Sequence, residues 1–199
     1  IYLSAPIGTV QDIKKLTNFK KKKSLHILYV GKLIKEKGID DLFLAYELIR
    51  KKIPENMVFL DIVGDGLMLK KLKTRINYNV TFHGWVDDID VMKKLYKKAS
   101  VLTFLSTENY PEGLPRVIEE AQSFGVPVCS TNILSVRKEF SKKNIKFFIS
   151  GQPETLSKAV IEIYKNKIVT DELVENGFKR LRNRYKMNAD EQHINLFKN

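Results

Sequence analysis

The most constraining feature of this sequence is a unit in which an apolar run closes at glycine and is followed by an amphipathic stretch. Residues 25–31 read Leu-His-Ile-Leu-Tyr-Val-Gly, and an amphipathic stretch follows over residues 38–52. Residues 57–63 are again apolar and close at a Gly-Asp-Gly loop, after which leucine and isoleucine recur at near-helical spacing over residues 67–76. Each unit predicts a strand, a loop and a helix.

The same alternation continues along the chain, with strands expected at 80–83, 101–105 and 126–130, a helix that Asp87 caps and that runs to Lys98, and a helix at 115–124. Strict alternation of strands and helices is typical of parallel pairing with right-handed crossovers. The sequence therefore predicts an α/β fold with a Rossmann-like, doubly wound parallel sheet. Ligands of such a sheet bind at the carboxyl ends of the strands.

The last third of the chain has only helical periodicity, with helices expected at 153–165, 170–182 and 188–197. These helices are expected to wrap the flank of the sheet. No composition shift marks an internal boundary, so residues 1–199 are predicted to form a single domain. Within it, residues 1–20 are expected to lead in from an N-terminal domain outside this sequence, and residues 185–199 to form a C-terminal helix.

The excess of positive charge bears on the choice of partner. A formal net charge of +12 has three interpretations: a nucleic-acid surface, attraction to anionic lipid, or a compositional bias toward lysine. Lysine is spread over nearly every segment and is densest at residues 20–23, without the interleaved arginine and aromatic residues that stack on bases. The distribution favours a solvated surface, keeps a peripheral membrane contact as a hypothesis, and disfavours nucleic acid.

Several other classes of protein are disfavoured. No apolar run approaches the roughly 20 residues of a membrane-spanning helix. The single cysteine, Cys129, lies among valines and is expected in a buried strand of a protein from a reducing compartment, which predicts a cytoplasmic location, with the inner face of the membrane as a further hypothesis. No metal-ligand spacing is present, and neither the dinucleotide fingerprint nor a phosphate-binding Gly-Lys-Ser or Gly-Lys-Thr loop is complete.

Residues 107–121 are the richest candidate for a site, because they directly follow a predicted strand. Pro115 suits a first helical turn, where its missing N–H would be unpaired in any case, and Gly113 lets the backbone approach a ligand. The backbone amides of Gly113, Leu114 and Arg116, together with the positive end of the helix dipole, are predicted to bind a diphosphate.

Two glutamates flank that helix start. Glu112 lies at the rim of the predicted diphosphate site. Glu120 is expected about a turn and a half inside the helix, among Val117, Ile118 and Ala121, where a carboxylate needs a partner. Ribose hydroxyls are one candidate partner. The ordinary alternative for either residue is an exposed helix position or a local salt bridge.

The stretch Glu-Gly-Leu-Pro-Arg-Val-Ile-Glu-Glu-Ala, followed by Gly-Val-Pro-Val, resembles the signature of the group 1 retaining glycosyltransferases, which have the GT-B fold. The two glutamates of the family signature, with seven residues between them, correspond to Glu112 and Glu120. The similarity covers nearly the whole chain in family order, with further matching segments at 30–38, 62–66, 82–86, 95–99 and 152–156.

The resemblance implies roles for individual residues. Glu120 would bind the nucleotide ribose, Glu112 would face the donor sugar, and the amides after Gly113 would hold the diphosphate. Lys32 and Lys37 correspond to the basic pair of the family, which neutralises charge on the leaving diphosphate.

Other positions depart from the family pattern or have an equal alternative. Backbone groups around Trp85 would read the edge of the nucleobase, although a half-buried aromatic residue is as good an interpretation. Lys32 stands where the family more often has arginine, so the bidentate fork is lost. Residues 135–139 lack the usual paired glycines and predict a loop of different shape, and Ser100 replaces a common aspartate.

The resemblance implies the C-terminal, donor-binding half of a retaining hexosyltransferase, which uses a nucleotide-diphosphate sugar and a glycan or lipid-linked acceptor in polysaccharide biosynthesis. By the same resemblance, such an enzyme is expected to require no metal or other cofactor. Glu112 would act by positioning and electrostatics, not as a nucleophile. Because the acceptor-binding N-terminal half is expected to be missing, the isolated domain is predicted to be inactive. The alternatives are a non-catalytic nucleotide-sugar-binding module and one half of a two-chain transferase.

Overall fold

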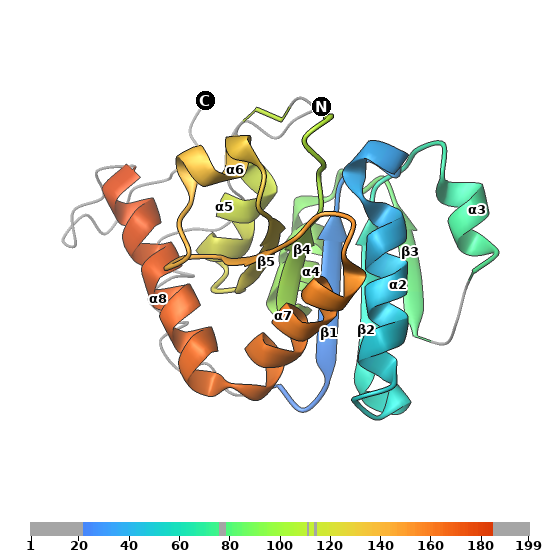
Figure 1. Ribbon diagram of the computed structural model, residues 1–199, viewed down its shortest axis with the longest axis horizontal. Coiled ribbons are helices and arrows are strands. Elements are labelled where there is room, and N and C mark those ends of the chain that lie inside the picture. The colour runs from blue at the N-terminus through green and yellow to red at the C-terminus, as the bar shows by residue number, and fades with distance from the viewer. Residues whose placement is uncertain (1–21, 76–78, 111, 114, 185–199) are drawn as a thin grey trace.

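A single parallel sheet organises the chain. The computed structural model describes residues 22–75, 79–110, 112–113 and 115–184. The strands within them are β1 (Leu25–Val30), β2 (Val58–Val63), β3 (Val80–Gly84), β4 (Val101–Phe104), β5 (Val128–Thr131) and β6 (Lys146–Phe148). They pair in the order β3-β2-β1-β4-β5-β6, and every pair is parallel (Figure 1). This is the doubly wound order with its reversal between β1 and β4, so the predicted fold class is confirmed.

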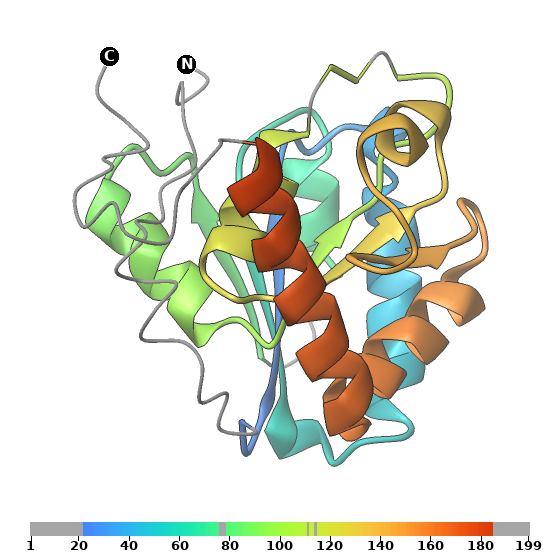
Figure 2. The same ribbon diagram turned by 90° about the vertical axis from the view of Figure 1, so that its left-hand side faces the viewer.

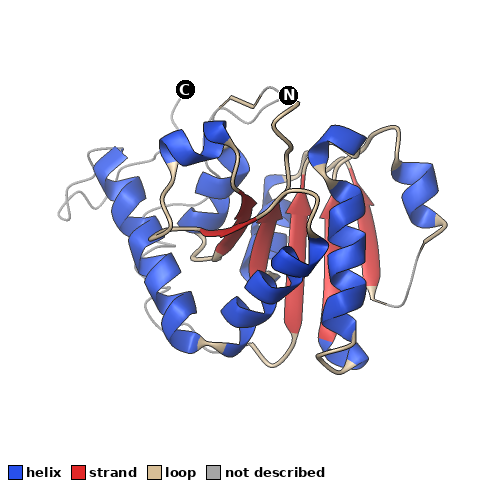
Figure 3. Ribbon diagram, in the orientation of Figure 1, coloured by secondary structure: helices blue, strands red, loops and turns tan. Residues whose placement is uncertain are grey.

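Helices cover both faces of the sheet, as Figure 3 shows. Their bounds are α2 (Ile39–Arg50), α3 (Leu69–Lys73), α4 (Ile89–Lys98), α5 (Arg116–Ser123), α6 (Leu134–Glu139), α7 (Pro153–Lys165) and α8 (Lys167–Arg184), with single 3-10 turns η1 (Lys35–Lys37) and η2 (Glu55–Met57). One buried cluster joins α2 and α7 to one face of the sheet, and a second joins α4 and α5 to the other. Helix α8 crosses the β6 end of the sheet and packs against α5 (Figure 2).

The central strands explain why the sequence shows apolar runs instead of alternation. Neighbouring residues of β1 point to opposite faces, so Ile27 enters the α2 and α7 cluster while Leu28 enters the α4 and α5 cluster. Both side chains are at most 1% exposed. A strand buried on both faces needs apolar residues at successive positions, which is what the sequence contains.

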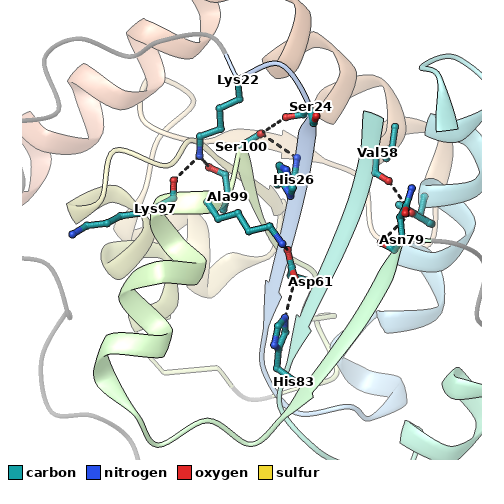
Figure 4. A network of polar contacts seen from close by, with 12 residues as sticks. Lys22, Ser24, His26, Val58, Asp61, Asn79, His83, Lys97, Ala99 and Ser100 are labelled. Carbon is teal, nitrogen blue, oxygen red and sulfur yellow. Dashed lines mark hydrogen bonds and ion pairs between the residues drawn. The ribbon is translucent and has the colours of Figure 1, made fainter. Parts of the chain in front are cut away.

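A polar network crosses the face of the sheet beneath α4 (Figure 4). Asp61 on β2 is 4% exposed and accepts hydrogen bonds at 3.0 Å from the Lys98 ammonium and at 2.8 Å from Nε2 of His83. At the start of β1, the Ser100 hydroxyl donates to the Ser24 carbonyl at 3.2 Å and accepts from the backbone amide of His26 at 3.0 Å. Ser100, one of the positions that depart from the family pattern, therefore joins the end of α4 to the first strand.

Several element boundaries differ from the predictions. The strand expected from Val126 begins at Val128, because Val126 N–H still bonds the Ala121 carbonyl and closes α5. Pro115 is the N-cap residue of α5 and not its first helical residue. The segment 135–139, predicted as a loop, belongs to α6. Strand β6 was not predicted.

Helix α4 offers a sharp test of another boundary, because Asp88 and not Asp87 caps it. The Asp88 carboxylate accepts from the amides of Asp90 at 2.8 Å and Val91 at 3.2 Å. We expect Asp88→Ala to lower the free energy of unfolding by about 1 kcal/mol. Asp87→Ala, which removes only an exposed contact with the Trp85 ring N–H, should cost less than about 0.5 kcal/mol. Urea unfolding followed by circular dichroism measures both, and equal losses would contradict the assignment.

Some predictions lie outside the described residues. These are the lead-in segment 1–20, the C-terminal helix over 185–199, the helix at 188–197 and the end of the helix predicted over 67–76. Within the described part of the chain, no helix combines the length and the apolar character that crossing a membrane requires.

Candidate functional site

The loops at the carboxyl ends of β1, β2 and β3 are held together by backbone contacts. The amide of Gly31 donates to the Val63 carbonyl at 3.0 Å, and the amide of Gly64 donates to the Gly84 carbonyl at 2.7 Å. Gly64 has φ +128°, and a Cβ there would lie 2.0 Å from the Gly31 carbonyl oxygen. The Gly-Asp-Gly loop therefore serves close packing of two strand ends, which only glycine at this position permits.

The turn η1 is anchored on the end of β4. Gly38 ends η1 in the left-handed conformation, with φ +62°, and a Cβ on it would lie 2.4 Å from the Leu105 carbonyl oxygen. The backbone amide and the hydroxyl of Thr107 each donate to the Glu36 carbonyl at 3.0 Å. These contacts hold Lys37 against the loop that follows β4.

Lys37 and Glu112, both predicted as site residues, form an ion pair. The Lys37 ammonium and the hydroxyl of Ser106 both donate to Oε1 of Glu112. The Lys37 and Glu112 side chains are only 13% and 11% exposed. The ammonium group also lies 4.2 Å from the centre of the Tyr110 ring, in a cation–π arrangement. Because the pair is shielded from water, its electrostatic interaction is stronger than that of a surface salt bridge.

Ser106 was not predicted, although a polar residue just beyond the predicted strand 101–105 was a usable signal. Its side chain is completely buried. Its carbonyl accepts a hydrogen bond at 2.7 Å from the hydroxyl of Thr131, at the end of β5. The ends of β4 and β5 thus hold the Ser106 backbone in place, and the Ser106 hydroxyl in turn orients Glu112.

A cavity of about 390 Å³ opens beside this ion pair. It contains two predicted site residues, Glu112 and Gly113, and it also brings together residues of the β4 and β5 loops and of α6. The residues that line it are Glu108, Tyr110, Glu112, Gly113, Ile133, Leu134, Ser135, Lys138 and Glu139. Lys32, Trp85, Arg116 and Glu120 are not among them.

The start of α5 lies next to this cavity. Gly113 is exposed and Arg116 half-buried, and Pro115 precedes the first helical residue. Leu114 lies outside the described residues, so its predicted amide contact stays a prediction. The free amides of the first turn and the helix dipole give this end of α5 a partial positive charge.

Glu120 has a partner within the protein, which the ribose prediction did not include. The Tyr96 hydroxyl donates to Oε2 of Glu120 at 2.7 Å, and Glu120 is 6% exposed. Burial raises the pKa of Glu120, against the smaller opposing effects of the Tyr96 hydrogen bond and the Arg116 charge. The Tyr96 contact is to Oε2 alone, and among the described residues Oε1 of Glu120 accepts no hydrogen bond; the ribose contact stays a prediction.

Lys32 and Trp85 lie on the loops after β1 and β3, away from the cavity lining. The Lys32 carbonyl accepts from the Tyr29 hydroxyl at 2.8 Å, and its side chain is exposed. Burial raises the pKa of Tyr29, so this hydroxyl stays a donor. Trp85 is 58% exposed and follows Gly84, whose φ is +67°. The half-buried alternative for Trp85 is therefore wrong, and its role toward a nucleobase stays a prediction.

A buried charge network that was not predicted joins α5 to α8 and α6. Glu119 is fully buried and forms ion pairs with Arg180 at 2.9 Å and with Arg184 at 3.2 Å. Arg184 also bonds Oε2 of Glu139 at 2.6 Å. The Arg180 guanidinium lies 4.0 Å from the centre of the Phe140 ring. Since Glu139 lines the cavity, the last described helix helps to set the shape of the site.

The described residues contain no group of three or more His, Cys, Asp and Glu side chains placed to hold a metal ion. Positive charge at the site comes instead from Lys37, Arg116 and the start of α5. The expectation that no metal is required stays a prediction.

Comparison with known proteins gives a consistent match. The family model described as "Glycosyl transferases group 1" matches residues 10–180. A curated relative from Campylobacter jejuni, an α-1,4-N-acetyl-D-galactosaminyltransferase whose name specifies an undecaprenol-diphosphate-linked glycan, is 29% identical over 159 residues. The alignment covers 77% of this chain and 42% of that relative. The chain thus spans less than half the length of the curated relatives that it matches.

Solved structures show the same fold. Anabaena HepE in complex with UDP-glucose superimposes with a TM-score of 0.70 at 22% identity, over 88% of this chain and 49% of that one. The C-terminal domain of a group 1 family protein from Francisella tularensis superimposes with a TM-score of 0.70 at 16% identity, over 89% of this chain and 93% of that domain. The chain therefore has the extent and fold of one C-terminal domain.

Proposed function

Because this chain belongs to the group 1 glycosyltransferases, we propose that it is the donor-binding half of a retaining hexosyltransferase. It would bind a nucleotide-diphosphate sugar for transfer to a glycan or lipid-linked acceptor in polysaccharide biosynthesis. The observation that carries the proposal is the shielded ion pair of Lys37 and Glu112, which lies between the start of α5 and a cavity large enough for a sugar ring. The C. jejuni relative, with its named glycan substrate, supports the acceptor class.

In this proposal the diphosphate lies at the start of α5. The amides of Gly113 and Arg116 would donate to its oxygens, and the ammonium groups of Lys37 and Lys32 would neutralise the charge that develops as the glycosidic bond breaks. Glu112 would orient the sugar from the cavity wall. The departing diphosphate would take the acceptor proton, so no protein nucleophile and no metal is needed.

The acceptor would be bound by an N-terminal half that this sequence does not include. We therefore propose that the chain binds donor but transfers sugar inefficiently by itself. An assay of transfer to added acceptor, with and without a candidate N-terminal partner, separates this proposal from a non-catalytic binding module, which stays inactive with every partner.

We also propose a cytoplasmic location with contact to the inner membrane face, and the charge of +12 supports the contact with anionic lipid. Flotation with liposomes that contain or lack anionic lipid tests that contact.

Glu120 gives a prediction in which stability and ligand binding change in opposite directions. Burial raises the Glu120 pKa above its ordinary value of 4.5, so the stability that its protonated form contributes is lost as the pH rises through the raised value. Glu120→Gln removes this pH-dependent loss of stability, because the amide carries no charge. Its side-chain oxygen can still accept the hydrogen bond from the Tyr96 hydroxyl. We expect the variant at pH 7 to be more stable by about 1 kcal/mol, with the gain shrinking as the pH falls through the raised pKa and lost below the ordinary value of 4.5. The same variant should bind nucleotide more weakly.

Thermal unfolding with UDP, GDP and ADP, without metal, measures both effects. In the wild type one nucleotide at about 100 times its dissociation constant should add roughly 2.7 kcal/mol of stability, and in Glu120→Gln this increment should fall sharply. Glu154→Gln, an exposed change on α7, controls for the loss of a carboxylate. No stabilisation of the wild type by any nucleotide would refute the proposed function.

A further inference from the structure

Three of the nine residues that line the cavity beside Lys37 and Glu112 are glutamates, and two of these are held so that one oxygen of each has no partner among the described residues. On Glu112 both described contacts, from Lys37 and Ser106, go to Oε1. On Glu139 the contacts from Arg184 and Arg180 both go to Oε2. Among the described residues, Oε2 of Glu112 and Oε1 of Glu139 accept no hydrogen bond. Each is a carboxyl oxygen that can accept a hydrogen bond from a ligand donor.

The orientation of Glu139 is fixed from outside the cavity. Arg184 bonds its carboxylate at 2.6 Å, and the Arg180 Nε donates to its backbone carbonyl at 2.9 Å. Both arginines are tied in turn to the buried Glu119 at 2.9 and 3.2 Å. A carboxylate held in this way loses less conformational entropy when it binds a ligand than a freely rotating surface glutamate does.

The remaining charged groups around the cavity decide what kind of ligand fits. Glu108 accepts from the Leu134 backbone amide at 3.2 Å, and Lys138 is the one cationic side chain among the lining residues that the structure describes. The carboxylates of Glu112 and Glu139 are each paired at one oxygen with a cationic side chain, so they act on a ligand through their other oxygen and not through a net negative charge. A carboxylate oxygen accepts hydrogen bonds, so it can pair with a hydroxyl of an uncharged sugar ring but not with the carboxylate of a uronate.

We infer that Glu139 is a second sugar-contacting residue, and that with Glu112 it selects donors whose sugar is uncharged over donors whose sugar is a uronate. This inference rests on the proposed function, since it places the transferred sugar in this cavity. Arg180 and Arg184 are positioning residues that hold Glu139 toward the ring. From the sequence, residues 135–139 were expected to form a loop of unusual shape, and no role was predicted for Glu139.

The test uses nucleotide sugars that differ only at C6: UDP-glucose with UDP-glucuronate, and GDP-mannose with GDP-mannuronate. Calorimetric titration of the chain also includes UDP and GDP alone. We expect the uncharged member of the better-bound pair to bind at least about tenfold more tightly than its uronate. In Glu139→Gln this preference should fall to about threefold or less, while affinity for the free diphosphate stays within about twofold.

Controls separate the two levels of the proposal. Glu172→Gln, an exposed change on α8, should leave the preference unchanged. Wild-type preference for the uronate, lost in Lys138→Met, would overturn the inference and assign selectivity to Lys138. If Glu139→Gln weakens the binding of free nucleoside diphosphate and of nucleotide sugar by the same factor, Glu139 acts only on the fold of the site. The inference then fails, while the proposed function stands. If no nucleotide binds the wild type, both fail together.

Discussion

Lys37→Met is expected to weaken binding of the free nucleoside diphosphate by roughly 10- to 100-fold, which is the loss of a charge-assisted contact in a shielded site. The Lys37 ammonium is 13% exposed and is held by Glu112 and the Tyr110 ring, so it is positioned before the ligand arrives. A preorganised charge of this kind contributes more to binding than a mobile surface lysine. Calorimetric titration with the nucleotide that stabilises the wild type measures the loss.

Lys35 is the matched control, because it lies on the same turn η1 but is exposed. Lys35→Met removes the same formal charge, so it reports the long-range electrostatic effect alone. Lys37→Arg should retain part of the affinity. If Lys35→Met and Lys37→Met weaken binding equally, the ion pair with Glu112 is a structural salt bridge and the diphosphate binds elsewhere.

Glu119→Ala is expected to lower the free energy of unfolding by about 3–5 kcal/mol, because it leaves buried positive charge uncompensated. The Glu119 carboxylate is fully buried, and Arg180, its partner at 2.9 Å, is only 11% exposed. The helices α5 and α8 meet at this contact. Urea unfolding at neutral pH measures the change, and the native circular dichroism spectrum shows whether the variant still folds.

The double variant Glu119→Leu with Arg180→Leu distinguishes loss of an ion pair from loss of packing. Removing both charges together should restore most of the stability, since a buried pair is often matched by apolar residues of similar volume. Glu154→Ala, an exposed change on α7, should have an effect near zero. A double variant as unstable as Glu119→Ala alone would contradict the charge argument.

The fold could be predicted because its signals are local. Strands β1, β2 and β4 are apolar runs that each contain a single polar residue, and each is followed by a loop and a helix. The elements that were missed or taken for a loop are short. Strand β6 has three residues, and α6 has six residues with no side-chain cap and Val136 as its buried residue. Too little periodicity exists in such segments to separate them from loops.

The candidate site was predicted in part. Glu112 and Gly113 were predicted from their residue types and position, and Lys37 from the family resemblance. The Lys37 and Glu112 ion pair joins residues 75 positions apart and depends on how η1 packs against β4. The same holds for Glu119 and Arg180, which are 61 positions apart. Tyr96 lies in the matching segment 95–99 but was assigned no role. Contacts of this range come from tertiary packing, which the pattern of a single sequence does not encode.

The exposure of Trp85 has a practical consequence for optical measurements on this protein. It is the single tryptophan of the chain, and in the folded state 58% of it is already in contact with solvent. Its emission should therefore change little on unfolding, and a melting curve recorded from it would understate the transition. A ligand that covers the indole at the end of β3 would instead shift the emission to shorter wavelength. The tryptophan fluorescence of this chain should thus report ligand binding at the β3 edge of the sheet. Its unfolding is better followed by circular dichroism of the backbone.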